Sequence, residues 1–285
     1  MIATNGLLFS GLVFRDAIEG FAEVGFDAFE LPHPVFYKDI FRGSAPAEVK
    51  PLCALVHDVG LGKLRLVSVN AANDFLQADE RKLEDEIGRT KVVIDTASEL
   101  GVGLVRVFVG EPKEGLSRTD CRELAIRGLR AVTEYASQND KVLALENHGR
   151  YSNDFGEQME ILKAIGSNNL RLNIDTGNYY WYGYPLREAE EVMRKAIPFA
   201  AHTHFKNGVS GEKDRRREPG QNYRTVRIWQ GDVDNAGFAR SLRDSGYKGA
   251  YSLEEEFEGM SSMGPEQLKE AVKEDIDKLN EVLRG

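Results

Sequence analysis

The stretch Val142-Leu-Ala-Leu-Glu146 is a short apolar run that stops on a side chain able to bind a metal ion. Three later stretches end in the same way, namely Leu172-Asn-Ile-Asp175, Phe199-Ala-Ala-His-Thr-His204 and Ala250-Tyr-Ser-Leu-Glu254. Their terminal residues are separated by 29, 29 and 50 positions, which fits one strand-plus-helix unit, a second unit, and a third with a long insertion. This spacing predicts that three carboxylates and one imidazole meet on one rim of a parallel barrel. Such ligands suit a divalent ion such as Mn, Mg, Co or Zn.

Eight short apolar or β-branched runs alternate along the chain with longer amphipathic patterns, as is typical of a parallel α/β sheet. The runs lie near residues 2–8, 27–31, 64–69, 103–109, 141–146, 170–175, 199–204 and 249–254. An even count of eight, with no hairpin turn beside any strand, favours a closed (β/α)8 TIM barrel, because closure removes the edge strands. The length of 285 residues and the lack of a linker predict a single TIM-barrel domain over residues 1–285.

The composition narrows the class of partner. Hydrophobic residues make up 41% and charged residues 29% of the chain, and no apolar run approaches the roughly 18 residues of a membrane span. A formal net charge of −9 argues against a nucleic-acid partner, because phosphate binding depends on clusters of lysine and arginine. The start of the chain shows no export signal, so we expect a cytoplasmic location and no membrane partner. Cys53 and Cys121 fall in helical patterns and are expected to be buried thiols.

Three of the five histidines, His148, His202 and His204, fall at or just beyond expected strand ends. Strand alternation places His202 and His204 on the same face, and the one nearer the strand end, His204, is the better metal ligand. His33 follows the second run and either faces the site or caps a loop, whereas His57 lies within a helical pattern.

The longest irregular stretch is 207–233, and a loop of that length on a compact domain is usually functional, most often a lid. It carries Arg215, Arg216 and Arg217, which form either a solvated face or a grip on a phosphate or carboxylate. Aromatic residues crowd the region after the Asp175 strand, where they either stack on a sugar or form an oligomer contact. These aromatics are Tyr179, Tyr180, Trp181, Tyr182 and Tyr184.

Four segments resemble the signature segments of the xylose isomerase-like barrels, specifically the sugar phosphate isomerase/epimerase family. They are Leu145-Glu-Asn-His-Gly149, Ile174-Asp-Thr-Gly-Asn178, His202-Thr-His-Phe-Lys-Asn207 and Tyr251-Ser-Leu-Glu-Glu-Glu256. The similarity runs over nearly the whole chain and is strongest from about residue 140 onward. The resemblance implies a TIM barrel with one divalent metal ion, whose ligands are Glu146, Asp175, His204 and Glu254.

The same resemblance implies that Lys206, His148 and His202 lie near the substrate. Hexulose 3-epimerases of this group usually carry histidine where this chain has Asn178, and asparagine cannot hold a proton equilibrium near neutral pH. This departure argues against epimerisation of a free ketose. The expected catalytic residues are Glu146, Glu254 and Lys206, and the expected substrate-binding residues are His148, His202, Asn178 and Glu256.

The leading hypothesis is a metal-dependent isomerase or epimerase that acts on a sugar, sugar phosphate or related polyhydroxy carbonyl compound. A carboxylate would remove the proton α to the carbonyl, and the ion would stabilise the resulting enediolate. A dehydratase of the inosose or dehydroshikimate type could use the same ligands, and a non-catalytic sugar-binding barrel is the alternative from another class. An apurinic endonuclease would need more metal ligands and a basic groove, which the sequence lacks. The family resemblance also makes a homo-oligomer plausible.

Overall fold

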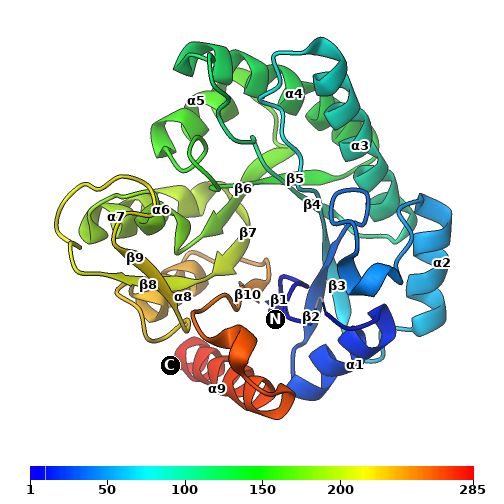
Figure 1. Ribbon diagram of the computed structural model, residues 1–285, viewed down its shortest axis with the longest axis vertical. Helices are drawn as coiled ribbons and strands as arrows, with labels where there is room; N and C mark the ends of the chain where they lie inside the picture. Colours follow the sequence, from blue (N-terminus) through cyan, green and yellow to red (C-terminus); the bar gives the residue numbers. More distant parts are fainter. Residues whose placement is uncertain (10) are drawn as a thin grey trace.

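Eight parallel strands close into a barrel in the computed structural model, which describes residues 1–9 and 11–285. The strands, in chain order, are β1 (Ile2–Thr4), β2 (Ala28–Pro32), β3 (Arg65–Asn70), β4 (Leu104–Val107), β5 (Val142–Glu146), β6 (Leu170–Asp175), β7 (Ala200–Phe205) and β10 (Tyr251–Leu253). Each strand pairs with its neighbours in the order β1-β10-β7-β6-β5-β4-β3-β2. Figure 1 shows this ring at the centre of the molecule. The predicted (β/α)8 TIM barrel is confirmed, and each strand overlaps one of the eight predicted runs.

Helices surround the ring of strands on the outside (Figure 1). The α-helices are α1 (Phe14–Val24), α2 (Val49–Val59), α3 (Glu80–Glu99), α4 (Arg118–Gln138), α5 (Phe155–Ile165), α6 (Asn178–Trp181), α7 (Leu186–Ala196), α8 (Asn235–Asp244) and α9 (Pro265–Arg284). Short 3-10 helices within the described residues are η1 (Ile40–Gly43), η2 (Ile197–Phe199) and η3 (Met260–Ser262). In the part of the chain that is described, no helix combines the length and the apolar character needed to cross a bilayer.

Local sequence explains where several of these helices begin. The Ser117 side chain accepts a hydrogen bond from the backbone of Asp120, and the Asp120 side chain accepts one from the backbone of Ser117. This reciprocal pair satisfies two amide groups that the first turn of α4 leaves unbonded. Asp79, Asp154 and Asp234 cap α3, α5 and α8 in the simpler one-sided way.

A register shift between β6 and β7 decides which side chains meet at the barrel mouth. Residue 172 pairs with residue 200, but residue 173 pairs with residue 202, so β7 carries one extra residue. The bulge places His204, rather than Thr203, beside Asp175. Bulges often re-aim side chains next to active sites. A similar shift lies just before Glu30 in β2.

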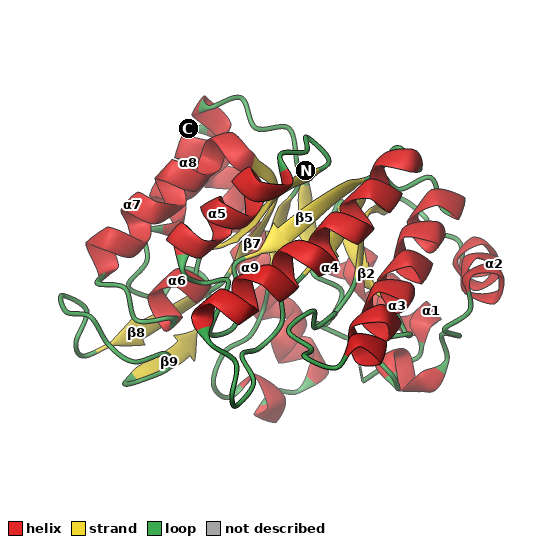
Figure 2. Ribbon diagram, turned by 90° about the horizontal axis from the view of Figure 1, so that it is seen from above, coloured by secondary structure: helices red, strands yellow, loops and turns green. Residues whose placement is uncertain are grey.

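The segment 207–233 is more ordered than the sequence indicates. It begins with β8 (Asn207–Ser210), which pairs with β9 (Tyr223–Val226) in an antiparallel sheet outside the barrel. The expectation that the stretch 207–233 is irregular is therefore wrong for β8 and β9. The two strands are joined by residues 211–222, which lack the short turn sequence by which a hairpin is recognised. Figure 2 shows β8, β9 and α6 grouped at the end of the molecule away from both termini.

The segment 207–233, called the insertion below, is held against the loop after α6 by a close backbone contact. The backbone amide of Arg217 donates to the carbonyl oxygen of Gly183 at 3.0 Å. Gly183 has a φ of 105°, and a Cβ atom there would stand 2.1 Å from the carbonyl oxygen of Arg217. Only glycine permits both this backbone conformation and this approach.

We expect Gly183→Ala to lower the free energy of unfolding more than Gly25→Ala, as measured by urea titration. Gly25 is a matched control, because its φ is also 105° but a Cβ there would meet nothing within 4 Å. The two variants share the cost of a left-handed alanine, and the difference between them, about 1–3 kcal/mol, reports the clash with Arg217. Equal losses would show that the contact at Gly183 does not hold the insertion.

Candidate metal centre

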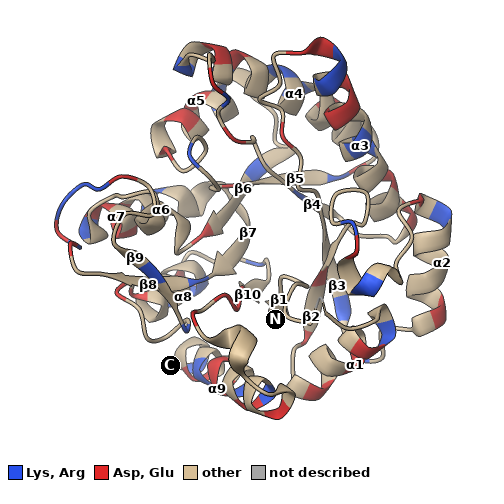
Figure 3. Ribbon diagram, viewed as in Figure 1, with Lys and Arg blue, Asp and Glu red and all other residues tan. Residues whose placement is uncertain are grey.

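Four potential metal ligands converge at the carboxyl ends of adjacent barrel strands. Glu146 ends β5, Asp175 ends β6, His204 lies in β7, and Glu254 directly follows β10. Each offers one ligand atom, and these atoms all lie within 4.8 Å of one another. Figure 3 shows acidic positions at the tip of β6 and in the segment after β10. The structure therefore brings together the four residues that the sequence analysis selected as ligands.

Three atoms of this cluster are buried and have no hydrogen-bond partner among the described residues. They are Oδ2 of Asp175, Nδ1 of His204 and Oε2 of Glu254. The other carboxylate oxygen of Asp175 is satisfied, because it accepts from the backbone amides of residues 177 and 178 at 2.9 and 2.8 Å. A buried polar atom without a partner costs about 1–3 kcal/mol, and a cation bound by these atoms would remove that cost. The donor set and its geometry therefore fit a divalent metal ion.

Glu30, in the middle of β2, was not identified from the sequence and lies behind His204. Its carboxylate is 3.1 Å from Nε2 of His204 and 2.9 Å from Nε2 of His202. Asn70 donates a further hydrogen bond to it at 2.7 Å, and Ser252 also donates. A carboxylate that accepts from Nε2 leaves Nδ1 of His204 free to face the other ligands. The signal was present, because Glu30 interrupts the apolar run of residues 28–31.

The ligand residues strongly perturb one another's protonation. Burial disfavours the charged imidazolium, yet the carboxylates of Glu30 and Glu146 outweigh this effect and hold the pKa of His204 well above its ordinary value. Burial raises the pKa of the Asp175 carboxyl well above its ordinary value. Burial alone would also raise the pKa of Glu254, but Lys206 and His204 hold it well below. A divalent cation would therefore compete with protons for these ligand atoms.

Lys206, just after β7, contacts two carboxylates of the ligand cluster and also Glu256 outside it. Its ammonium nitrogen lies 3.6 Å from Oδ2 of Asp175, 3.4 Å from Oε1 of Glu254 and 3.2 Å from Oε2 of Glu256. Only 7% of its surface is exposed. Burial opposes its charge, but Asp175 and Glu254 keep the pKa of Lys206 well above its ordinary value. The lysine therefore remains cationic.

Arg106 of β4 is the second cation beside the ligand cluster, and the sequence analysis did not identify it. Its guanidinium donates to the backbone oxygen of Ala71 at 2.6 Å and to the hydroxyl of Tyr37 at 2.7 Å. Its Nε lies 3.3 Å from Oε2 of Glu146. The guanidinium carbon is 4.1 Å from the centroid of the Phe108 ring, which also stacks on His148 at 4.2 Å. No sequence signal marks this arginine, because it alternates with valines in an ordinary strand pattern.

Two contiguous cavities lie in front of the cluster. The inner one has a volume of about 430 Å³ and is lined by Glu146, His204 and Glu254, together with Arg106. The outer one measures about 770 Å³. Both include His148, Lys206 and Glu256 in their walls, so the two cavities are adjacent.

The remaining predicted site residues are placed as follows. Asn178 lines the outer cavity, and its amide donates to the backbone oxygen of Asn147 at 2.9 Å. His202 lies against Glu30 and is absent from the described walls of both cavities. His33 is buried and bonded to Thr96 at 2.9 Å, whereas His57 is exposed on α2.

The three consecutive arginines make their contacts within the insertion or with residues near α6. Arg217 is buried and donates to the backbone oxygen of Tyr180 at 2.8 Å. The guanidinium carbon of Arg216 lies 4.0 Å from the centroid of the Tyr184 ring, and Arg215 pairs with Glu212. Within the described chain, none of the three lines either cavity. Their contacts with the aromatic residues near α6 are structural.

Comparison with known proteins finds relatives by sequence and solved structures with a similar fold. An inosose isomerase from Halalkalibacterium halodurans is 24% identical over 209 residues, with 70% of each chain covered. A 3-dehydroshikimate dehydratase from Pseudomonas aeruginosa is 26% identical over 255 residues, which cover 84% of this chain and 35% of that longer protein. Among solved structures, the IolI protein with a bound zinc atom superposes with a TM-score of 0.74 at 16% identity, covering 98% of this chain and 97% of that one.

The relatives by sequence are thus an isomerase and a dehydratase, which supports an enzyme of the sugar-modifying class. A model of the family described as xylose isomerase-like TIM barrel matches residues 18–282, so nearly all of the chain is covered. The protein belongs to the family of xylose isomerase-like TIM barrels.

Proposed function

We propose that this protein is a divalent-metal-dependent isomerase or epimerase of a sugar, sugar phosphate or related polyhydroxy carbonyl compound, and that it acts by removing a proton α to the carbonyl. The observation that carries the proposal is the convergence of three buried ligand atoms without hydrogen bonds, from Asp175, His204 and Glu254, beside a cavity that Lys206 also lines. A divalent ion bound there supplies the Lewis acidity that polarises a carbonyl and acidifies its α-proton. Mn, Mg, Co and Zn all suit this ligand set.

Glu146, Asp175, His204 and Glu254 hold the ion in this proposal, and Glu30 positions one of them. The carboxylate of Glu30 is surrounded by donors from Asn70 and Ser252 as well as from both histidines. Replacing one of its oxygens by an amide NH2 would set a donor against one of these donors, so at least one contact must break. The contact with His204 is the one that fixes the orientation of a ligand.

We expect Glu30→Gln to raise the Kd for Mn²⁺ by about 10-fold to 100-fold, measured by isothermal titration calorimetry on metal-stripped protein. Asp27→Asn is a matched control, because Asp27 accepts from the backbone amide of Ile2 at 2.8 Å, three residues before Glu30, and touches no proposed ligand. The control should bind Mn²⁺ as the unmodified protein does. Unchanged affinity in Glu30→Gln, with an unaltered thermal midpoint, would contradict the positioning role.

Glu146 and Glu254 are the proposed bases. Both line the inner cavity, whereas Asp175 is fully buried and is absent from the described walls of that cavity. Strands β6 and β7 lie between β5, which carries Glu146, and β10, which precedes Glu254. The two carboxylates therefore approach the cavity from different sides. A proton removed by one and returned from the other side would invert the carbon, and a proton returned to the adjacent carbon would isomerise the substrate.

Lys206 acts as a fixed positive charge in this scheme. Because its pKa is raised, it does not accept the substrate proton at neutral pH. It lies within hydrogen-bonding reach of Glu256 and close to Glu254, so it can donate to a substrate oxygen on which negative charge develops. His148 and Asn178, which border the same space, are the proposed hydroxyl-binding groups.

A dehydratase acting on a keto acid is the second candidate. It is favoured by Arg106, whose guanidinium borders the inner cavity and has the planar shape suited to a carboxylate. The same α-proton removal would then be followed by expulsion of a β-hydroxyl group. Product analysis separates the two reactions, because only the dehydratase changes the mass of the substrate by one water.

We expect the metal-loaded protein to exchange a substrate α-proton in deuterated water for at least one member of a panel of ketoses, sugar phosphates, inososes and keto acids. Glu146→Gln and Glu254→Gln should lower the exchange rate on the order of 10²-fold to 10⁴-fold, since each removes a base. Nuclear magnetic resonance measures the exchange, and calorimetry and metal analysis show whether substrate and ion are still bound.

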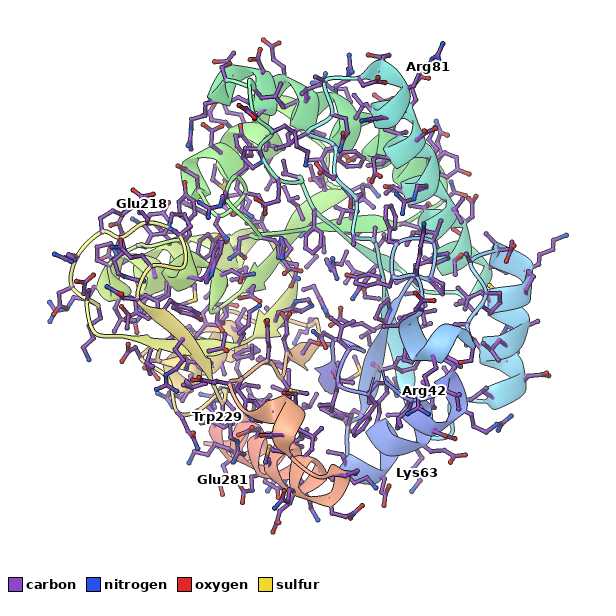
Figure 4. All side chains as sticks on the ribbon, in the orientation of Figure 1. Arg42, Lys63, Arg81, Glu218, Trp229 and Glu281 are labelled. Atoms are coloured by element: carbon purple, nitrogen blue, oxygen red, sulfur yellow. The ribbon has the colours of Figure 1, made fainter. Side chains whose placement is uncertain are left out.

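Glu281→Gln is the surface control, because Glu281 pairs with Lys278 on α9 at the edge of the molecule labelled in Figure 4. It should leave exchange unchanged, since an exposed pair contributes little. Binding without exchange in the unmodified protein, for every compound and ion tried, would favour a non-catalytic sugar-binding barrel instead.

A further inference from the structure

The outer cavity provides more room than a single sugar at the metal end requires. The inner cavity already has a volume of about 430 Å³, within the range of sites that enclose a whole small ligand. The outer cavity adds about 770 Å³ and lies between the insertion, α6 and the segment after β10. A reacting group that fills the inner cavity would leave the outer one free for a second group of the same molecule.

The outer cavity is walled by aromatic groups from three separate segments. Trp181 comes from α6, Tyr223 from β9 and Phe257 from the segment after β10, and all three are half-buried. A pyranose ring presents flat C–H faces to such side chains, and each aromatic ring offers a large contact area at a small entropic cost. Tyr223 is the ring that the segment 207–233 contributes to this wall, because β9 lies within that segment.

Tyr223 also offers an unused polar group. Its hydroxyl oxygen is buried, and within residues 1–9 and 11–285 it has no hydrogen-bond partner. The ring lies against the backbone of Gly208, where a Cβ would come within 2.2 Å of it. The glycine thus lets the ring settle into the wall of the cavity. A buried hydroxyl without a partner costs free energy, which a ligand hydroxyl would recover.

The charges around the outer cavity argue against an anionic occupant. Its walls carry two cations, Lys206 and Arg224, and three carboxylates. Lys206 lies 3.2 Å from Glu256, and Arg224 lies 3.4 Å from Glu258, so each cation already faces a carboxylate. The third carboxylate, Glu111, adds a further negative charge. A phosphate or a free carboxylate would be repelled, whereas neutral hydroxyl groups can hydrogen-bond to these side chains.

We propose that the outer cavity is a subsite for a neutral sugar ring, so that the substrate is a carbonyl sugar joined by a glycosidic bond to a second sugar. This inference rests on the proposed function, because it assumes that the carbonyl end lies beside the metal ligands. When the anomeric carbon of the reacting sugar is itself the one joined, the carbonyl must be a ring ketone. An oxidation of a ring hydroxyl must then supply the substrate.

The test compares binding of matched compounds to the Mn²⁺-loaded protein by calorimetry. The compounds are fructose, fructose 6-phosphate, and two disaccharides that contain fructose, lactulose and isomaltulose, together with a 3-keto disaccharide and its 3-keto monosaccharide methyl glycoside. We expect at least one disaccharide to bind 10-fold or more tightly than its monosaccharide counterpart, and the phosphate to bind no more tightly than fructose. Disaccharides that bind no better than their counterparts would overturn the proposal.

Two variants test whether the tighter binding of disaccharides arises from contacts in the outer cavity. Trp181→Ala and Tyr223→Phe should each weaken disaccharide binding by about 5-fold to 10-fold while leaving the monosaccharide Kd within 2-fold. Tyr223→Phe removes only the hydroxyl, so it remains informative if Trp181→Ala fails to fold. Equal weakening for both classes of compound would show a general structural effect and contradict the subsite.

The same samples separate this inference from the proposed function. Proton exchange with both classes of compound, without any preference for disaccharides, would overturn the subsite and retain the proposed chemistry. Tight disaccharide binding that depends on Trp181, without exchange for any compound or ion, would retain the subsite and overturn the chemistry.

Discussion

Concentrated negative charge at the barrel mouth is the constraint around which the rest of this site is arranged. Glu30, Glu146 and Asp175 are buried, and Glu254 lies beside them at the rim. Carboxylates in such a place are strongly unfavourable unless cations or hydrogen-bond donors compensate them. The chain supplies Lys206, Arg106 and two histidines for this purpose, yet three ligand atoms make no hydrogen bond among the described residues. A divalent cation would compensate the remaining negative charge.

Sequence alone predicts the fold and the four converging ligands for a simple physical reason. In each case a strand that must be buried ends on a residue that burial disfavours, and parallel strands bring their carboxyl ends together. Glu30 escapes this rule because it lies inside its strand rather than at its end. The sequence selects His204 over His202 by its position nearer the strand end, but alternation of apolar and polar residues does not reveal the one-residue bulge in β7 that sets His204 beside Asp175.

The structure of the insertion also could not be predicted in full from the sequence. Its hairpin joins strands separated by residues 211–222, so no short turn sequence announces it. Its arginines resemble an anion-binding run, but Arg216 and Arg217 are bound to the aromatic face of the loop around α6. Their charge is therefore used to hold the insertion in place. The residues of this segment that line the outer cavity are Tyr223, Arg224 and Thr225, none of which belongs to a recognised motif.

Asn178 is not suited to transfer the substrate proton. Its amide is held by the backbone oxygen of Asn147, and an amide neither gains nor loses a proton near neutral pH. Lys206 is equally unsuited to accept a proton, because Asp175 and Glu254 keep it charged. Arg106 is always protonated. The proposed bases, Glu146 and Glu254, border the inner cavity from different strands, so a substrate proton could leave and return from different directions.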